Sequence, residues 1–163
     1  MSVIAFKLNI TQKQLPVEPE IIYETETIYI EVPAEEQNVS EAPFYGDLVT
    51  QLSQEDIDLL AQIIYLEAGN QSLAGQRAVA EVVFNRMLDA RFPNTLQGVI
   101  FAPGQFTTAG HLSAAKPGDK QYEAIEITLS EVHPILPSNV VYFATYVANG
   151  TKYERIGDHY FCY

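Results

Sequence analysis

The sequence is poor in cysteine and in basic residues, and each shortage excludes a class of function. Cys162 is the one cysteine among 163 residues, which excludes an internal disulfide framework and a zinc site built from cysteines. Lysine and arginine number 9 against 21 acidic residues, a formal net charge of −12. Nucleic-acid binding and attachment to anionic lipid both depend on clustered cations. We therefore expect neither nucleic acid nor a lipid surface as a partner.

Long apolar runs and metal-binding patterns are also absent from the sequence. No run approaches the roughly 18 apolar residues of a membrane-spanning helix, and residues 1–10 lack the apolar stretch of a signal peptide. Export by another route, or a leader outside this sequence, remains open. The three histidines, His111, His133 and His159, have no paired spacing typical of metal ligands. We expect no metal and no cofactor.

Charge and proline divide the chain into two parts. Residues 1–50 have a net charge of −7 and four of the nine prolines, whereas residues 51–163 have a net charge of −5. We interpret residues 1–50 as an acidic, extended arm or linker and residues 51–163 as one domain. An alternative is that Ile21 to Val32, rich in β-branched residues and tyrosine, forms a strand that pairs with a sheet edge. That edge would belong to this chain or to a protein partner of the arm.

Capping residues predict two successive helices at the start of the domain. Ser53 and Asp56 form a capping box before apolar residues at helical spacing, and Gly69 predicts a left-handed end to that helix. Ser72 predicts the cap of a second helix, which ends before Pro93. Its apolar stripe consists of Ala78, Val79, Val82, Val83 and Met87.

The rest of the domain predicts shorter elements. A short helix is expected over 95–101, an irregular stretch over 102–118, and a helix capped by Asp119 that continues to about Val132. Strand-forming residues over 139–147, a turn at 149–150 and a return strand over 160–163 predict a hairpin. The fold class that follows is α+β, mostly helical, with a small C-terminal β-hairpin.

Glu67 is the residue that most needs an explanation. It follows four apolar or aromatic residues at the end of the first helix. Apolar surroundings favour the protonated form of a carboxyl group, which is the form that a general acid requires. The alternative is that Glu67 is a solvent-facing residue at the end of an amphipathic helix, as most surface glutamates are.

The segments around Glu67 resemble a known family. They are Tyr65-Leu66-Glu67-Ala68-Gly69-Asn70-Gln71-Ser72, Gly75-Gln76-Arg77-Ala78-Val79-Ala80 and Val82-Val83-Phe84-Asn85-Arg86, followed by Phe92-Pro93-Asn94-Thr95, Gln105-Phe106-Thr107 and Ile156-Gly157-Asp158-His159-Tyr160-Phe161. This pattern resembles the spore cortex-lytic (SleB/CwlJ-type) cell-wall hydrolases over about residues 55–163.

The resemblance implies a lysozyme-like domain that cleaves peptidoglycan glycan strands as a lytic transglycosylase. It implies that Glu67 is the single acid/base and that no second carboxylate acts as nucleophile. Two departures bear on this expectation: the chain has no tryptophan and a short, idiosyncratic region after Gly110, and its net charge is acidic. An acidic enzyme is repelled by an anionic wall, so we expect one tethered at the cell wall, extracellular or carried by a phage particle.

The substrate-binding candidates come from the loop and strand motifs. Gln105, Phe106, Thr107 and Thr108 match the family's loop that faces the cleft, although core packing is an equal alternative for Phe106. Tyr142 and Tyr146 are expected on one side of the hairpin, where aromatic rings stack on sugars, and His159 lies in the closing motif. Arg86 is expected to be a structural hydrogen-bonding group.

A single-acid mechanism requires that no other carboxylate lies beside Glu67. The next acidic residues after Glu67 are Glu81, Asp89 and Asp119, and Glu81 is expected on the polar side of its helix. We expect none of them at hydrolytic distance from Glu67, and therefore anhydro products. The competing function is a non-catalytic structural or binding component, for example of a phage particle, that retains the lysozyme-like domain.

Overall fold

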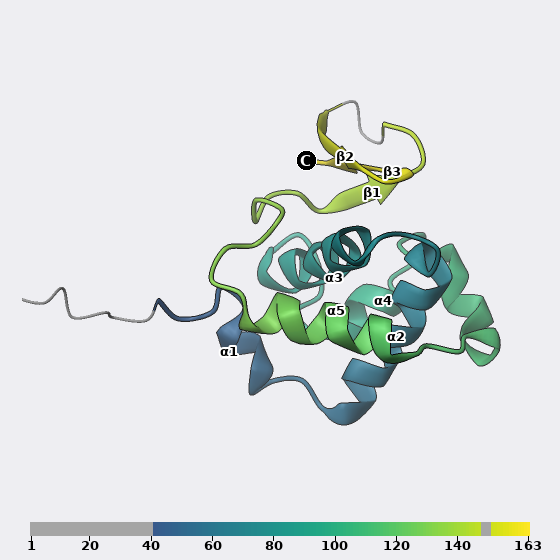
Figure 1. Ribbon diagram of the computed structural model, residues 1–163, viewed down its shortest axis with the longest axis horizontal. Helices are drawn as coiled ribbons and strands as arrows, with labels where there is room; N and C mark the ends of the chain where they lie inside the picture. The colour runs from purple at the N-terminus through teal and green to yellow at the C-terminus, as the bar shows by residue number, and fades with distance from the viewer. Residues whose placement is uncertain (1–40, 148–150) are drawn as a thin grey trace, which may run out of the picture. The chain divides into compact units, whose positions relative to one another are not determined.

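The computed structural model describes residues 41–147 and 151–163, which belong to one compact unit beginning at Glu41. The predicted strand over 21–32, most of the predicted arm and the predicted turn at 149–150 lie outside the described residues. The helices are α1 (Gly46–Val49), α2 (Gln54–Ala68), α3 (Leu73–Leu88), α4 (Leu96–Phe101), the 3-10 helix η1 (Thr107–Ala114) and α5 (Asp119–Ser130). The strands are β1 (Tyr142–Ala144), β2 (Lys152–Ile156) and β3 (His159–Cys162) (Figure 1). A mostly helical α+β fold is therefore confirmed.

The predicted helix starts are confirmed, and two predicted caps are wrong. Ser53 caps α2 through a capping box with Asp56, and Ser72 caps α3. Gly69 keeps right-handed angles (φ −58°), and a Cβ there would come within 2.5 Å of the carbonyl oxygen of Tyr65. Glycine at this position therefore permits a close approach of the backbone. Helix α5 is capped from Gly118, whose N–H donates to Gln121, and Asp119 is the first helical residue.

Helix α3 lies at the centre of the fold. Helices α2, α4 and α5 and the sheet all pack on it (Figure 1), and twelve of its sixteen residues are buried. The predicted apolar stripe is buried, but so are polar residues on the other sides of the helix. Glu81 is fully buried, so its predicted place on a solvent-facing side is wrong. A helix that is buried over most of its length has no continuous polar face, and its buried polar side chains need hydrogen-bond partners from neighbouring backbone and side chains.

The sheet contains one strand more than the predicted hairpin. Its order is β1-β3-β2 and all pairings are antiparallel, with Phe143 opposite Phe161 and Ile156 opposite His159. The actual hairpin joins β2 to β3 through Gly157, which has a positive φ of 59°. Strand β2 escaped prediction because three of its five residues are charged. Strand β1 covers only three of the nine residues expected there.

The packed domain begins before residue 51. Tyr45 and Leu48 are buried in the main core, and the Tyr45 hydroxyl donates to Asn85 Oδ1 at 2.8 Å. The backbone N–H of Phe44 donates to the Glu131 carbonyl oxygen at 2.9 Å. Helix α1 therefore contributes to the same core as α2–α5.

Candidate active site

Glu67 lies in the last turn of α2 and is half-buried. The Thr108 hydroxyl of η1 donates a hydrogen bond to Glu67 Oε1. Ile63, Ile64 and Ala68, on the same helix, are fully buried in the core. Helix α2 thus carries the carboxylate and η1 provides its hydrogen-bond donor, although Glu67 and Thr108 lie 41 residues apart in the sequence.

A buried arginine lies close to this carboxylate. Arg86 of α3 is 3% exposed, and its guanidinium carbon lies 5.1 Å from the ring centroid of Phe106, 5.5 Å from Phe92 and 5.9 Å from Tyr142. Its Nε donates to the carbonyl oxygen of Val141 at 2.7 Å. Burial lowers the pKa of Arg86 to about 10, and the charges of Tyr142 and Glu67 act against this shift. The guanidinium therefore stays charged at neutral pH, within electrostatic range of Glu67.

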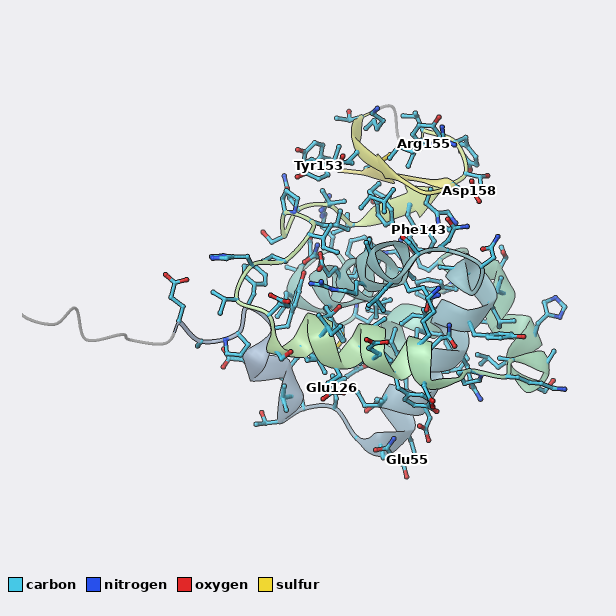
Figure 2. All side chains as sticks on the ribbon, in the orientation of Figure 1. Glu55, Glu126, Phe143, Tyr153, Arg155 and Asp158 are labelled. Atoms are coloured by element: carbon cyan, nitrogen blue, oxygen red, sulfur yellow. The ribbon has the colours of Figure 1, made fainter. Side chains whose placement is uncertain are left out.

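His159 approaches Glu67 from the sheet. Its ring is buried and meets the Phe143 ring edge-on at 5.4 Å (Phe143 is labelled in Figure 2, where it points from the sheet toward the helices). Burial lowers the pKa of His159, whereas the charges of Glu67 and Asp158 act to raise it. Its Nδ1 has no hydrogen-bond partner among the described residues. His159 is therefore neutral at pH 7 and lies within electrostatic range of Glu67.

A side-chain clamp attaches the β2–β3 turn to the loop after Glu67. Gln71 Oε1 accepts from the backbone N–H of Asp158 at 3.1 Å, and Gln71 Nε2 donates to Asp158 Oδ2 at 2.9 Å. Figure 2 labels Asp158 at the right-hand end of the sheet. A Cβ at Gly157 would overlap the Gln71 amide oxygen. This clamp places His159, the next residue, near Glu67.

Hydrogen bonds of buried side-chain amides connect this clamp to helices α3 and α5. Gln76 Nε2 donates to the carbonyl oxygens of Gln71 at 3.2 Å and Gly69 at 3.4 Å. Gln121 Nε2 in turn donates to Gln76 Oε1 at 2.8 Å, and Gln121 Oε1 accepts from the Gly118 N–H. The backbone directly after Glu67 is therefore fixed by side chains from α3 and α5. Sequence reasoning missed these glutamines, although a glutamine beside an apolar helix stripe is the signal that would have found Gln76.

The structure brings four of the predicted site residues to Glu67 or to its neighbours. Thr108 contacts Glu67 directly, and His159 acts on it electrostatically. Phe106 is buried under Arg86, which agrees with the packing alternative, and Tyr142 lies beside the same guanidinium.

Three other predicted site residues form no hydrogen bond with Glu67 within the described residues. Gln105 is half-buried and Thr107 is exposed at the start of η1. Tyr146 lies beyond the end of β1 and is 69% exposed. The alternation that paired it with Tyr142 is wrong because the strand ends at Ala144.

Two of the other carboxylates are bound to different groups. Glu81 accepts from the backbone N–H groups of Ile135 at 3.0 Å and Leu136 at 2.7 Å. Burial raises the pKa of Glu81, against the effect of these two hydrogen bonds. Asp89 forms an ion pair with Arg91 at 2.6 Å, and Asp119 lies exposed in the first turn of α5.

The described residues form neither a cluster of metal ligands nor a membrane-spanning helix. Among residues 41–147 and 151–163, no three histidine, cysteine or acidic side chains lie close enough together to hold a metal ion. Within the same residues, none of the helices has the length and apolar character needed to cross a membrane.

Comparison with known proteins identifies the family. The family model described as cell wall hydrolase matches residues 70–162, more than half of the chain. The chain belongs to this family of cell wall hydrolases, as the sequence motifs predicted. The match begins three residues after Glu67, so the role of Glu67 stays a prediction.

Similar proteins agree with this family. The chain is 35% identical over 118 residues to the spore cortex-lytic enzyme of Oceanobacillus iheyensis, a match that covers 68% of this chain and 42% of that protein. It is 35% identical over 119 residues to the spore cortex-lytic enzyme of Bacillus subtilis, with 68% and 38% covered. The chain therefore spans about two fifths of the length of these curated relatives.

Two solved structures share the fold. One is the catalytic domain of the Bacillus cereus SleB protein, with a TM-score of 0.59 and 33% identity over 68% of this chain and 91% of that one. The other is the catalytic domain of the germination-specific lytic transglycosylase SleB from Bacillus anthracis, with a TM-score of 0.60 and 30% identity over 69% of this chain and 97% of that one. The described domain thus corresponds to nearly the whole of these catalytic domains.

Proposed function

We propose that this protein is a lytic transglycosylase that cleaves peptidoglycan glycan strands between N-acetylmuramic acid and N-acetylglucosamine. The observation that carries the proposal is Glu67, a half-buried carboxylate held by Thr108, with a buried arginine and a neutral histidine beside it. The similarity to SleB catalytic domains, one of them named a lytic transglycosylase, supports this assignment.

In the proposed reaction Glu67 acts first as an acid and then as a base. Its proton passes to the glycosidic oxygen while the bond from that oxygen to the muramic C1 breaks. The muramic 6-hydroxyl then attacks C1, and its proton passes to the Glu67 carboxylate. One bond breaks, one forms, Glu67 regains its starting state, and no water is consumed. The products are a strand with a new N-acetylglucosamine 4-hydroxyl and a 1,6-anhydromuramic end.

The dispositions of Glu81 and Asp89 support a mechanism with one carboxylate. A second carboxylate within about 5–5.5 Å would act as a nucleophile, and one about 6.5–9.5 Å away would activate water. Glu81 is committed to two backbone N–H groups and Asp89 to Arg91. Thr107, Gln105, Tyr142 and Tyr146 are proposed to contact the sugars, with Thr108 orienting the acid.

Substitution of Glu67 by glutamine tests the function. The amide keeps the size of the side chain but cannot donate a proton at the required acidity. We expect Glu67→Gln to fold normally and to lose at least about a thousandfold in rate. Glu55→Gln is the matched control, because Glu55 is an exposed glutamate in the first turn of the same helix (Figure 2).

Mass spectrometry of digested sacculi reports both activity and chemistry. Anhydromuramic ends in the wild-type digest are the expected result. Reducing muramic ends would make the protein a hydrolase and leave Glu67 as its acid. Binding to sacculi without any cleavage would instead favour the structural or binding component.

The location and organisation of the protein follow from this function. We propose action at the cell wall or outside the cell, and an association with phage particles remains a prediction. We also propose that the catalytic domain begins near Glu41, because Tyr45 and Leu48 belong to its core. The acidic residues before Glu41 remain a predicted arm, which we propose binds a protein partner and so localises the enzyme.

A further inference from the structure

Arg86 is a buried cation that lacks an acidic hydrogen-bonding partner. It is 3% exposed, its Nε bonds to a backbone carbonyl, and its Nη1 has no hydrogen-bond partner among the described residues. The ion pair found in the described residues joins Arg91 to Asp89 and does not involve Arg86. Burying an unpaired charge is costly, so this guanidinium requires compensation from its surroundings.

Three aromatic rings supply part of that compensation and fix the guanidinium in place. The rings of Phe106, Phe92 and Tyr142 lie 5.1–5.9 Å from its central carbon, within the range of cation–π attraction. Phe106 lies two residues before Thr108, whose hydroxyl holds Glu67. The same short segment therefore contacts both the cation and the carboxylate.

Other charged or titratable groups border this region from each packed element. His159 from β3 is neutral at pH 7 because burial lowers its pKa, and Tyr142 from β1 acts on Arg86 electrostatically. Lys120 from α5 donates to the Gln71 carbonyl oxygen at 2.6 Å and is exposed. Arg86 from α3 differs from these groups in being both charged at pH 7 and buried.

We propose that Arg86 is an electrostatic positioning residue that stabilises the carboxylate form of Glu67. That form arises when the proton passes to the leaving oxygen, and it must persist until it accepts the proton of the 6-hydroxyl. Opposite charges attract far more strongly in the protein interior than in water. Because Arg86 is 3% exposed and forms no hydrogen bond with Glu67 among the described residues, it is proposed to act on Glu67 through its charge. This inference rests on the proposed acid/base role of Glu67.

The pH dependence of the cleavage rate tests the inference. In Arg86→Met the carboxylate is less stable, so Glu67 stays protonated to higher pH. We expect the alkaline limb of the pH–rate profile to move to higher pH by about one unit and the maximal cleavage rate to fall about tenfold. Arg86→Lys keeps the charge and should keep the wild-type limb, and Lys116→Met controls for loss of an exposed cation. An unshifted limb in a folded Arg86→Met protein would overturn the inference.

A stability measurement tests the same coupling without any activity. The melting temperature of Glu67→Gln is compared with that of the wild type at about pH 8 and about pH 2.5, above and well below the ordinary glutamate pKa of about 4.3. We expect the substitution to lower the melting temperature more at pH 8, where Arg86 loses an ionised partner. Equal effects at both pH values would overturn the inference even if Arg86→Met fails to fold. Failure of the proposed function would appear separately, as cleavage by Glu67→Gln.

Discussion

The helical part of the domain and its C-terminal sheet are held by different forces. Helices α2–α5 share a core of apolar side chains, most of which are completely inaccessible to solvent. Apolar packing also reaches the sheet, through Phe143 and Phe161, but the segment that leads into it is tied by buried polar side chains of α3. The comparison teaches that the spacing of apolar residues in the sequence specifies the helices. The position of the sheet relative to the helices depends on a few individual hydrogen bonds.

The largest effect is expected from removing α1, which tests whether the helical core is complete without it. A protein that starts at residue 51 loses two buried side chains, Tyr45 and Leu48, and the Tyr45–Asn85 hydrogen bond. We expect it to be less stable by about 5 kcal/mol than a protein that starts at residue 41. Urea unfolding of the two proteins measures the difference, and equal midpoints would place the boundary at 51 after all.

Asn85 tests the polar attachment of the sheet. Its side chain donates to the carbonyl oxygens of Pro137 and Val140, both at 3.0 Å, and accepts from Tyr45. Asn85→Ala leaves three groups without this partner and should cost about 3 kcal/mol. Asn139→Ala, an exposed change in the same segment, should cost less than about 0.5 kcal/mol. Similar losses in the two variants would show that apolar packing alone holds the segment.

Substitution of Gln71 tests whether the attachment of the sheet affects the catalytic rate more than the stability of the domain. Gln71→Ala breaks the clamp on Asp158, so the position of His159 relaxes. We expect a stability loss of about 1–2 kcal/mol and a rate loss of about tenfold. Gln51→Ala is the control, since Gln51 is exposed and bonds only to a nearby backbone carbonyl. A rate equal to that of the wild type would mean that the clamp does not position the site.

The smallest expected effect is a pH dependence from His159. Its folded pKa lies below the ordinary value of 6.5, so the unfolded chain binds the proton more readily. The stability that neutral His159 contributes is therefore present above pH 6.5 and is lost as the pH falls. Between about pH 7 and 5, His159→Phe should reduce the acid-induced loss of unfolding free energy by roughly 1 kcal/mol or less. The exposed His111→Asn variant should leave that dependence unchanged.

Local signals predicted the helices well and the sheet poorly. The capping box at Ser53 and the cap at Ser72 depend on residues three positions apart, which the sequence displays directly. Strand β2 carries Lys152, Glu154 and Arg155 and is a strand only because β3 pairs with it. The pairing is local, across the turn at Gly157, but the charged side chains of β2 hide the apolar pattern that would have indicated a strand.

The sequence predicted Glu67 and Thr108 of the candidate site but not the buried side chains that surround them. Glu67 and Thr108 were identified from motifs, and the structure shows the hydrogen bond between them. Gln71, Gln76 and Gln121 went unassigned because most of their partners are backbone atoms or side chains far away in the sequence. The burial of Arg86 was also unforeseen, since an arginine in a sequence is by default an exposed residue.

The hydrogen bonds from α3 side chains to residues 135–141 all reach main-chain atoms. Glu81 binds two N–H groups, and Asn85 and Arg86 bind three carbonyl oxygens. A main-chain group is present whatever the side chain, so mutational tolerance along this stretch should be asymmetric. Randomising the exposed Ser138 and Asn139 should yield mostly active variants, whereas few replacements at positions 81, 85 and 86 would survive the same selection. The exposed positions of this connector can therefore vary in sequence, whereas its buried side chains and the helix that binds its main chain cannot.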